Sequence, residues 1–168
     1  MKRNPDRHSA RREFLLAAGG IAAGIALESA AASPPTPAAA SRAAASTEAT
    51  LQAIRKVTGA APVNKGKVTV VLPELVDNGN AVPLAVQVES PMTPNDYVKA
   101  IHVFTQKNPL PDVATFRLGP RAGRASVATR IRLADTQTVT AICELSDSSF
   151  WSGSADVVVT IAACLEEL

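Results

Sequence analysis

Residues 137–146 read QTVTAICELS, and apolar and polar side chains alternate along most of this stretch. Successive side chains of a strand point to opposite sides, so one face carries Val139, Ala141, Cys143 and Leu145. A period of two over this length predicts a β-strand with one buried face. We expect Cys143 to lie on that face as a small, buried hydrophobic residue.

Stretches of the same kind lie on both sides of this one, separated by turn residues about every 8–12 residues. A strong turn signal, Asp77–Asn80, separates the first two. Seven short strands in series predict an all-β chain, and we expect an immunoglobulin-like β-sandwich of about seven strands. The other six stretches are residues 67–72, 81–89, 98–105, 112–118, 124–133 and 155–162.

One short N-terminal helix is expected ahead of the strands. Leu51, Ile54 and Val57 recur at the spacing of one helix face. Gly59 follows them, and glycine is the usual residue just after a helix end. The pattern therefore predicts a helix over residues 47–58.

The first residues have the pattern of an export signal. Residues 2–12 are polar and basic, the pair Arg11 and Arg12 precedes an apolar run at 14–27, and alanine-rich cleavage sites follow. This order predicts that residues 1–32 are a signal peptide of the twin-arginine type. The apolar run is shorter than the ~20 residues that cross a bilayer. We therefore expect a periplasmic protein with no membrane contact after cleavage.

Three further segments complete the predicted organisation. Residues 33–46 are rich in proline, alanine and serine, and we expect a disordered linker there. We assign residues 47–162 to the β-sandwich. Residues 163–168 form a predicted C-terminal arm.

Charge and motifs exclude several classes of function. Five of the 17 basic and three of the 15 acidic residues lie in 1–32, so twelve of each sign remain and we expect no nucleic-acid binding. The sequence has no glycine-rich phosphate loop, no HExxH motif and no CxxC motif. His102 shares a predicted strand face with Ala100 and Phe104, so we expect a hydrogen-bonded structural residue. We therefore expect no catalytic residue, no metal site and no cofactor.

Two groups of residues are candidates for contact with a partner. Phe150 and Trp151 fall in the predicted loop before the last strand, and aromatic residues are enriched in interface cores. The alternative is that they plug one end of the sandwich. A cluster of arginines could attract an anion or an acidic partner, or it could be a solvated face; its members are Arg117, Arg121, Arg124, Arg130 and Arg132.

Cys164 follows the last predicted strand and is among the final five residues. A thiol near a chain terminus is accessible to another protein. A hairpin turning near Phe150 would place Cys143 opposite Val157, with Cys164 ~24 Å further along the strand at ~3.4 Å per residue. A disulfide needs Cα atoms within ~7 Å, so we expect no bond between Cys143 and Cys164.

From about residue 47 onward, the sequence resembles the SoxY family, the sulfur-carrying subunits of the periplasmic thiosulfate-oxidising (Sox) system. Two phrases carry the likeness together with the twin-arginine leader: KAIHVFTQKNPLPDVATFRLGPRAGRASVATRIRLADTQTVTAICELSDSSFW at 99–151 and DVVVTIAAC at 156–164. These two segments are longer than a short motif and therefore more specific to one family.

The resemblance implies a carrier protein and not a stand-alone enzyme. It implies that Cys164 holds sulfur intermediates covalently and that the chain forms a heterodimer with a SoxZ-like subunit. Transient partners would be a haem-containing thiosulfate-coupling enzyme, a sulfate-releasing hydrolase and a sulfur dehydrogenase. A twin-arginine signal fits this assembly, because a partner without a leader would cross the membrane as part of a folded complex.

The C-terminal ending departs from the family pattern, in which glycine pairs flank the cysteine. Here residues 162–168 read AACLEEL; alanine lacks the conformational freedom of glycine, and Glu166 and Glu167 favour the thiol over the reactive thiolate. Two interpretations stay open, a sulfur carrier and a noncatalytic SoxY paralogue that acts as an interaction module without sulfur loading. A third, an unrelated sandwich with a structural or copper-binding role, has little support because no ligand cluster is apparent.

Overall fold

The computed structural model describes the backbone of residues 37–163 and the side chains of residues 45–163. All of them belong to one unit of the chain, Pro35–Leu168. The predicted signal peptide with Arg11 and Arg12, and the predicted carrier residue Cys164, lie outside the described residues. Among the described helices, none has the length and hydropathy of a membrane-spanning segment.

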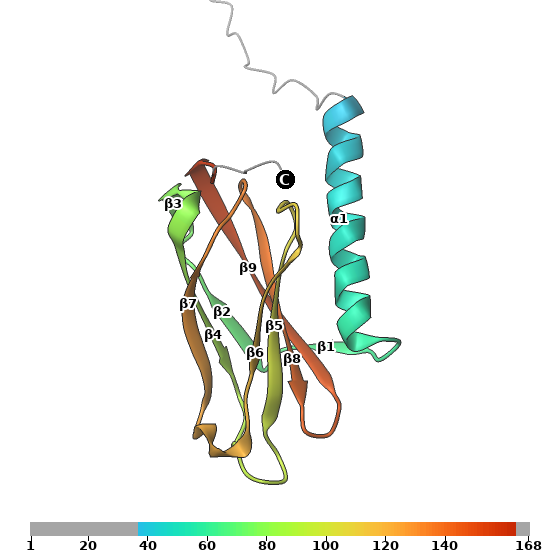
Figure 1. Ribbon diagram of the computed structural model, residues 1–168, viewed down its shortest axis with the longest axis vertical. Helices are drawn as coiled ribbons and strands as arrows, with labels where there is room; N and C mark the ends of the chain where they lie inside the picture. The colour runs from blue at the N-terminus through green and yellow to red at the C-terminus, as the bar shows by residue number, and fades with distance from the viewer. Residues whose placement is uncertain (1–36, 164–168) are drawn as a thin grey trace, which may run out of the picture. The chain divides into compact units, whose positions relative to one another are not determined.

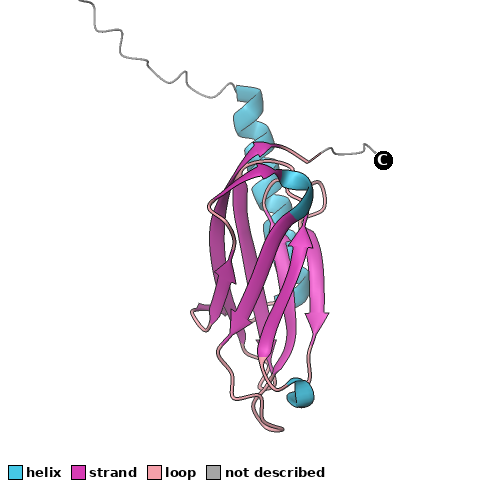
Figure 2. Cartoon of the chain, turned by 90° about the vertical axis from the view of Figure 1, so that its left-hand side faces the viewer, coloured by secondary structure: helices cyan, strands magenta, loops and turns pink. Residues whose placement is uncertain are grey.

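Two β-sheets pack face to face (Figures 1 and 2). The larger sheet has the strand order β1-β9-β8-β5-β6, with β3 also paired to β9, and the smaller has the order β2-β4-β7. This arrangement confirms the predicted immunoglobulin-like sandwich. The strands are β1 (Val63–Lys65), β2 (Val68–Val71), β3 (Leu75–Asn78), β4 (Val82–Val88), β5 (Val98–Thr105), β6 (Asp112–Arg117), β7 (Ala125–Ile131), β8 (Gln137–Leu145) and β9 (Phe150–Ile161).

Hydrophobic side chains of both sheets form the main core between them. The alternation in β8 is as predicted, and its core residues are Val139, Ala141, Cys143 and Leu145. The facing strand of the smaller sheet alternates in the same way, with Val82, Leu84, Val86 and Val88 buried. Because each such side chain contributes about 1.5–3 kcal/mol when it leaves water, this core is the main source of the sandwich's stability.

The helix α1 is longer than the sequence predicted. It spans Pro37–Thr58, so the prediction of a disordered linker over 33–46 was wrong from residue 37 onward. Alanine has the highest helix propensity, and proline is favoured at the first helical position because the N–H there has no partner in the helix. The predicted end was correct: Gly59 has φ of 62° and donates its N–H to the Arg55 carbonyl at 2.8 Å.

Helix α1 covers the outer face of the larger sheet, beside β5, β8 and β9 (Figure 1). Its residues Ala53, Ile54 and Val57 pack against a second cluster that consists of Phe104, Ile142 and Phe150. The Thr50 hydroxyl also donates a hydrogen bond to the Thr105 carbonyl at 2.9 Å. The centre of the larger sheet is therefore buried on both faces.

Strand β9 begins five residues earlier than the predicted strand 155–162. Its first part is rich in serine and glycine, which is typical of a loop, yet it pairs with β8 and places Gly153 opposite Ala141. The Ser152 hydroxyl donates to the Asn64 carbonyl of β1 at 3.2 Å. Pairing with neighbours on both sides therefore overrides the local composition.

The described chain has nine strands where about seven were expected, because β1 and β3 were not predicted. Both are short and pair in parallel with β9, β1 near its start and β3 near its end. The predicted turn Asp77–Asn80 was also displaced: Asp77 and Asn78 belong to β3, and the chain turns at the 3₁₀ helix η1 (Gly79–Ala81). The three residues of β1 are too few to show a period, and β3 contains Asp77 and Asn78, which signal a turn.

Candidate functional site

The two cysteines have different surroundings. Cys143 is fully buried in the main core and is a free thiol. It lies opposite Trp151 in the register of β8 and β9, and not opposite Val157 as the hairpin argument assumed. Burial raises the pKa of the Cys143 thiol to about 11, so it stays protonated at neutral pH. A buried, protonated thiol is a poor nucleophile, which leaves Cys164 as the reactive candidate.

The last described residue, Ala163, is held against the end of the sandwich. Residues 160–162 are exposed, but Ala163 is only 4% exposed. Its N–H donates to the Leu133 carbonyl at 3.1 Å, and the Leu133 N–H donates to the Gly79 carbonyl at 2.8 Å. Ala163 was assigned to the arm 163–168, yet it is buried and hydrogen-bonded to the sandwich.

Exposed apolar residues lie near this end of β9. Leu75 and Val158 are paired across β3 and β9 and are 61% and 49% exposed. Ile161, two residues before Ala163, is 63% exposed. The position from which Cys164 continues is therefore flanked by an apolar surface.

The aromatic pair Phe150 and Trp151 lies in β9, so its predicted place in a loop was wrong. The two side chains point to opposite faces of the sheet. Phe150 is buried beneath α1, and the chain's own helix covers it. Trp151 is half-buried at the edge of the main core, with the Lys67 ammonium 4.6 Å from its ring centroid. A partner interface at Trp151 stays a prediction.

His102 is the structural residue that the sequence predicted. Its Nδ1 is 3.0 Å from the Thr115 hydroxyl, and its ring stacks on Phe104 with centroids 6.4 Å apart. Desolvation by burial lowers the pKa of His102, and the carboxylates of Asp112 and Glu144 partly oppose that shift. The ring is therefore neutral at pH 7 and belongs to the packing between sheet and helix.

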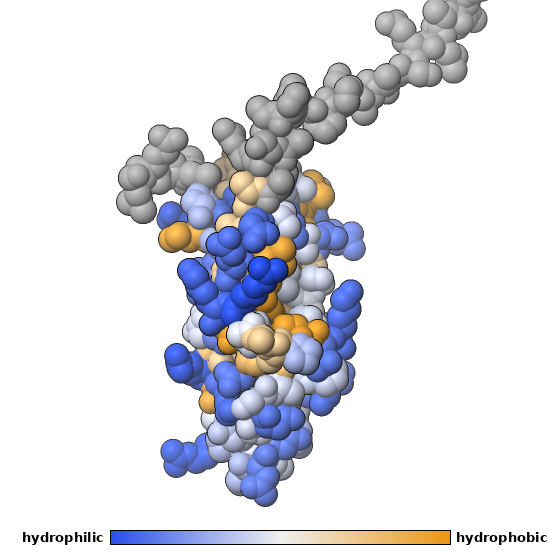
Figure 3. All heavy atoms as spheres, turned by 90° about the vertical axis from the view of Figure 1, so that its right-hand side faces the viewer, coloured by the Kyte–Doolittle hydropathy of each residue, from blue (hydrophilic) through white to orange (hydrophobic). Residues whose placement is uncertain are grey.

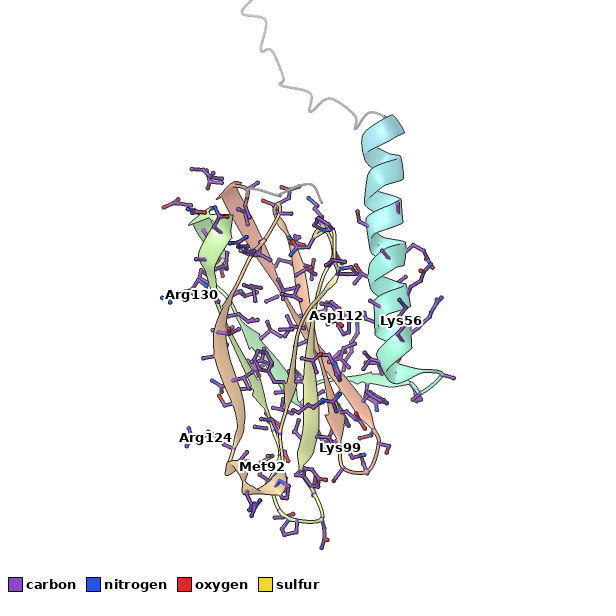
Figure 4. The ribbon with its side chains drawn as sticks, in the orientation of Figure 1. Lys56, Met92, Lys99, Asp112, Arg124 and Arg130 are labelled. Carbon is purple, nitrogen blue, oxygen red and sulfur yellow. The ribbon has the colours of Figure 1, made fainter. Side chains whose placement is uncertain are left out.

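The arginine cluster is exposed along β6, β7 and their connection. None of these side chains forms an ion pair with a carboxylate among residues 45–163. Figure 4 shows Arg124 and Arg130 projecting outward from the β7 side. An unpaired basic surface suits an anion or an acidic partner, as the sequence suggested; the members are Arg117, Arg121, Arg124, Arg130 and Arg132.

A groove of about 360 Å³ separates α1 from the start of β6. Lys56 of the helix and Asp112 of the strand lie on its two sides (Figure 4). The surface on this side of the molecule is mostly hydrophilic, with smaller hydrophobic patches (Figure 3). The groove is lined by Ala49, Gln52, Ala53, Lys56, Val57, Leu110, Pro111 and Asp112.

In the described part of the chain, no group of three or more histidine, cysteine or acidic residues could hold a metal ion.

The sequence did not indicate that Gly79 and Leu133 contact the end of the chain. The turn signal at Asp77–Asn80 marked Gly79 as a turn residue, and Leu133 ended a predicted strand. Neither pattern indicates contact with a remote terminus. Their role becomes visible through backbone hydrogen bonds between distant segments.

Comparison with known proteins identifies the family. The model of the family described as "Sulfur oxidation protein SoxY" matches residues 54–164. The sulfur carrier protein SoxY from Chlorobium limicola f thiosulfatophilum is 27% identical, with a TM-score of 0.60, over 71% of this chain and 98% of that one. No curated protein sequence matches.

A superoxide reductase (neelaredoxin) from Ignicoccus hospitalis has the same type of fold. It is 15% identical, with a TM-score of 0.50, over 56% of this chain and 80% of that one. This likeness concerns the fold alone, whereas the family match covers most of the sandwich and ends at the predicted carrier residue, Cys164. The chain belongs to the SoxY family of sulfur oxidation proteins.

Proposed function

We propose that this protein is a periplasmic carrier that holds sulfur intermediates covalently on Cys164 during thiosulfate oxidation. The observation that carries this proposal is the extent of the family match, which includes Cys164 as its final residue. The burial of Cys143 supports it, because the second thiol of the chain is inaccessible. The solved SoxY relative is itself described as a sulfur carrier protein.

The carrier chemistry requires one thiol and partner enzymes. In the loading step the Cys164 sulfur forms an S–S bond with the outer sulfur of thiosulfate. The thiol loses its proton, and two electrons pass to the haem-containing partner. In the next step a hydrolase adds water, releases sulfate and a proton, and leaves a persulfide on Cys164. A sulfur dehydrogenase then acts on that persulfide, so the carrier itself needs no cofactor and is not an enzyme.

The proposed assembly is a heterodimer with a SoxZ-like subunit, exported through the signal that contains Arg11 and Arg12. The half-exposed Trp151 and the unpaired Arg124, Arg130 and Arg132 in and beside β7 are available to such a partner. Co-purification of a leaderless β-sandwich subunit from the periplasmic fraction would support this assembly. Recovery of the chain as a lone subunit from that fraction would contradict it.

Replacing Cys164 tests the carrier role directly. In Cys164→Ser we expect complete loss of sulfur loading with an unchanged melting temperature, because the thiol is the attachment atom and serine differs from cysteine by that one atom. Intact-mass spectrometry of protein from thiosulfate-grown cells measures the thiosulfonate or persulfide adduct. The matched variant Cys143→Ala should keep the adduct and lose about 1 kcal/mol of stability through a small core cavity.

An unmodified thiol in the wild-type protein under turnover conditions would contradict the carrier and support the noncatalytic paralogue. The unusual tail allows a second comparison. Exchanging residues 162–168 for an ending with glycine pairs around the cysteine should increase the loading rate, since two carboxylates beside the thiol are removed. An equal rate would show that the alanine and glutamate residues do not impede loading.

A further inference from the structure

The chain returns to the protein surface just before the predicted carrier residue. After β9 ends at Ile161, residue 162 is exposed, and the next residue, Ala163, is buried at 4% exposure. A chain end that simply frayed into solvent would leave its last residues exposed. The burial of Ala163 therefore reflects specific contacts.

Those contacts join three segments that are far apart in the sequence. Ala163 donates its N–H to the Leu133 carbonyl at 3.1 Å, and Leu133 donates its N–H to the Gly79 carbonyl at 2.8 Å. Leu133 is fully buried, so its backbone position is determined by the main core. The end of β9, η1 and the connection from β7 to β8 consequently meet at one end of the sandwich, drawn at the top of Figure 1.

The close approach of these segments depends on the missing side chain at Gly79. A Cβ placed there would overlap the Leu133 carbonyl oxygen, and it would lie 2.9 Å from the Ala163 nitrogen and 3.1 Å from Val159 Cγ1. Two of these three neighbours are backbone atoms, which cannot move aside as a flexible side chain can. A residue larger than glycine would therefore require a backbone shift where Gly79, Leu133 and Ala163 meet, and we expect this shift to loosen the contact with Ala163.

We propose that Gly79 and Leu133 are positioning residues for the carrier thiol, because they anchor Ala163 and thereby hold the root of the arm. We call these three residues the C-terminal anchor. The Cα of Cys164 is about 3.8 Å from that of Ala163 across a trans peptide bond, so anchoring the root confines the thiol to one end of the sandwich. Partner enzymes then meet the thiol at a defined place, which lowers the entropic cost of the reaction.

This inference rests on the proposed function of Cys164, but the anchor itself is measured without sulfur chemistry. In the full-length protein, the Ala163 amide should exchange with solvent at least about tenfold more slowly than in an unstructured peptide, because it is buried and hydrogen-bonded. Exchange at the rate of an unstructured peptide would overturn the anchor. This measurement needs no variant.

A spectroscopic comparison of two glycine variants tests the role of Gly79. A nitroxide label reacts with Cys164 and not with the buried Cys143, so its spectrum reports the motion of the arm. Gly79→Ala should make the label clearly more mobile. Gly119→Ala is the matched control, since a Cβ there meets nothing within 4 Å and the residue has φ of −144°. Equal label mobility in both variants would overturn the proposal.

Loading with thiosulfate and the coupling enzyme separates this inference from the proposed function. Slower loading in Gly79→Ala than in Gly119→Ala, at a temperature at which both variants are folded, supports a positioning role. Equal loading of both variants, with a more mobile label in Gly79→Ala alone, would overturn positioning but leave the carrier intact. Absence of loading in the wild-type protein would refute the carrier function while the amide exchange of Ala163 still measured the anchor.

Discussion

His102 shows how a residue that suggests catalysis serves packing. It stacks on Phe104, which packs against α1, and it accepts or donates one hydrogen bond with Thr115. Because burial lowers the pKa of His102, the unfolded chain binds a proton more readily than the folded protein. The contribution of His102 is therefore fully present above pH ~6.5 and is lost as the pH falls through its folded-state pKa.

The pH dependence of stability tests this assignment. We expect the free energy of unfolding of the wild-type protein to decrease between pH 7.5 and 5.5, and we expect His102→Gln to flatten that dependence. The pKa values of Asp135 and Asp147 are lowered, so those groups titrate at more acidic pH. Urea unfolding of both proteins at several pH values measures the slopes. An equal dependence of the free energy of unfolding on pH in the wild type and in His102→Gln would show that His102 does not cause it.

Helix α1 depends on tertiary contacts in its C-terminal half. There Ile54 and Val57 face the second cluster, whereas Leu51 is 42% exposed. Most of the stability of a helix in a protein comes from tertiary packing of its apolar face, so the face packed on the sheet supplies much of the stability of α1.

Two alanine substitutions in the same helix measure that contribution. Ile54→Ala should cost about 2 kcal/mol, because it removes side-chain atoms packed against Phe104 and Phe150. Leu51→Ala should change the free energy of unfolding by less than about 0.5 kcal/mol, since its side chain is largely in solvent. Denaturant unfolding compares the two. Equal losses would mean that α1 does not pack as described.

The two sheets approach each other closely where β9 passes β2. A Cβ on Gly153 would overlap the carbonyl oxygen of Val68 and lie 3.2 Å from the Val68 Cβ. Neither sheet can yield there without a shift of the backbone. Gly153, which lies in the serine- and glycine-rich part of β9, thus allows the two sheets to pack closely at this point.

Gly153→Ala should therefore destabilise the whole molecule by about 3 kcal/mol, at the upper end of the range for overpacking. Gly119→Ala, at an open position, should have an effect within about 0.5 kcal/mol. Thermal unfolding, followed by circular dichroism, distinguishes the two variants. A melting temperature in Gly153→Ala equal to that of the control would contradict the close contact between β9 and Val68.

Local patterns were sufficient for the faces of the longer strands, for the end of α1 at Gly59 and for the burial of Cys143. The backbone geometry of a strand or helix dictates side-chain direction, so the period of the apolar residues reports which face is buried. The fold class followed from the number and spacing of these strands, and the likeness to SoxY agreed with it.

The start of β9, the opposite orientations of Phe150 and Trp151 and the anchoring of Ala163 could not be read from such patterns. Each depends on backbone hydrogen bonds or close contacts between segments that are remote along the chain, such as Gly79 with the end of β9. Such long-range contacts leave no periodic pattern of apolar residues in the sequence around the residues that form them. The position of Ala163, from which the chain continues to Cys164, is therefore a property of the folded sandwich and not of the neighbouring residues in the sequence.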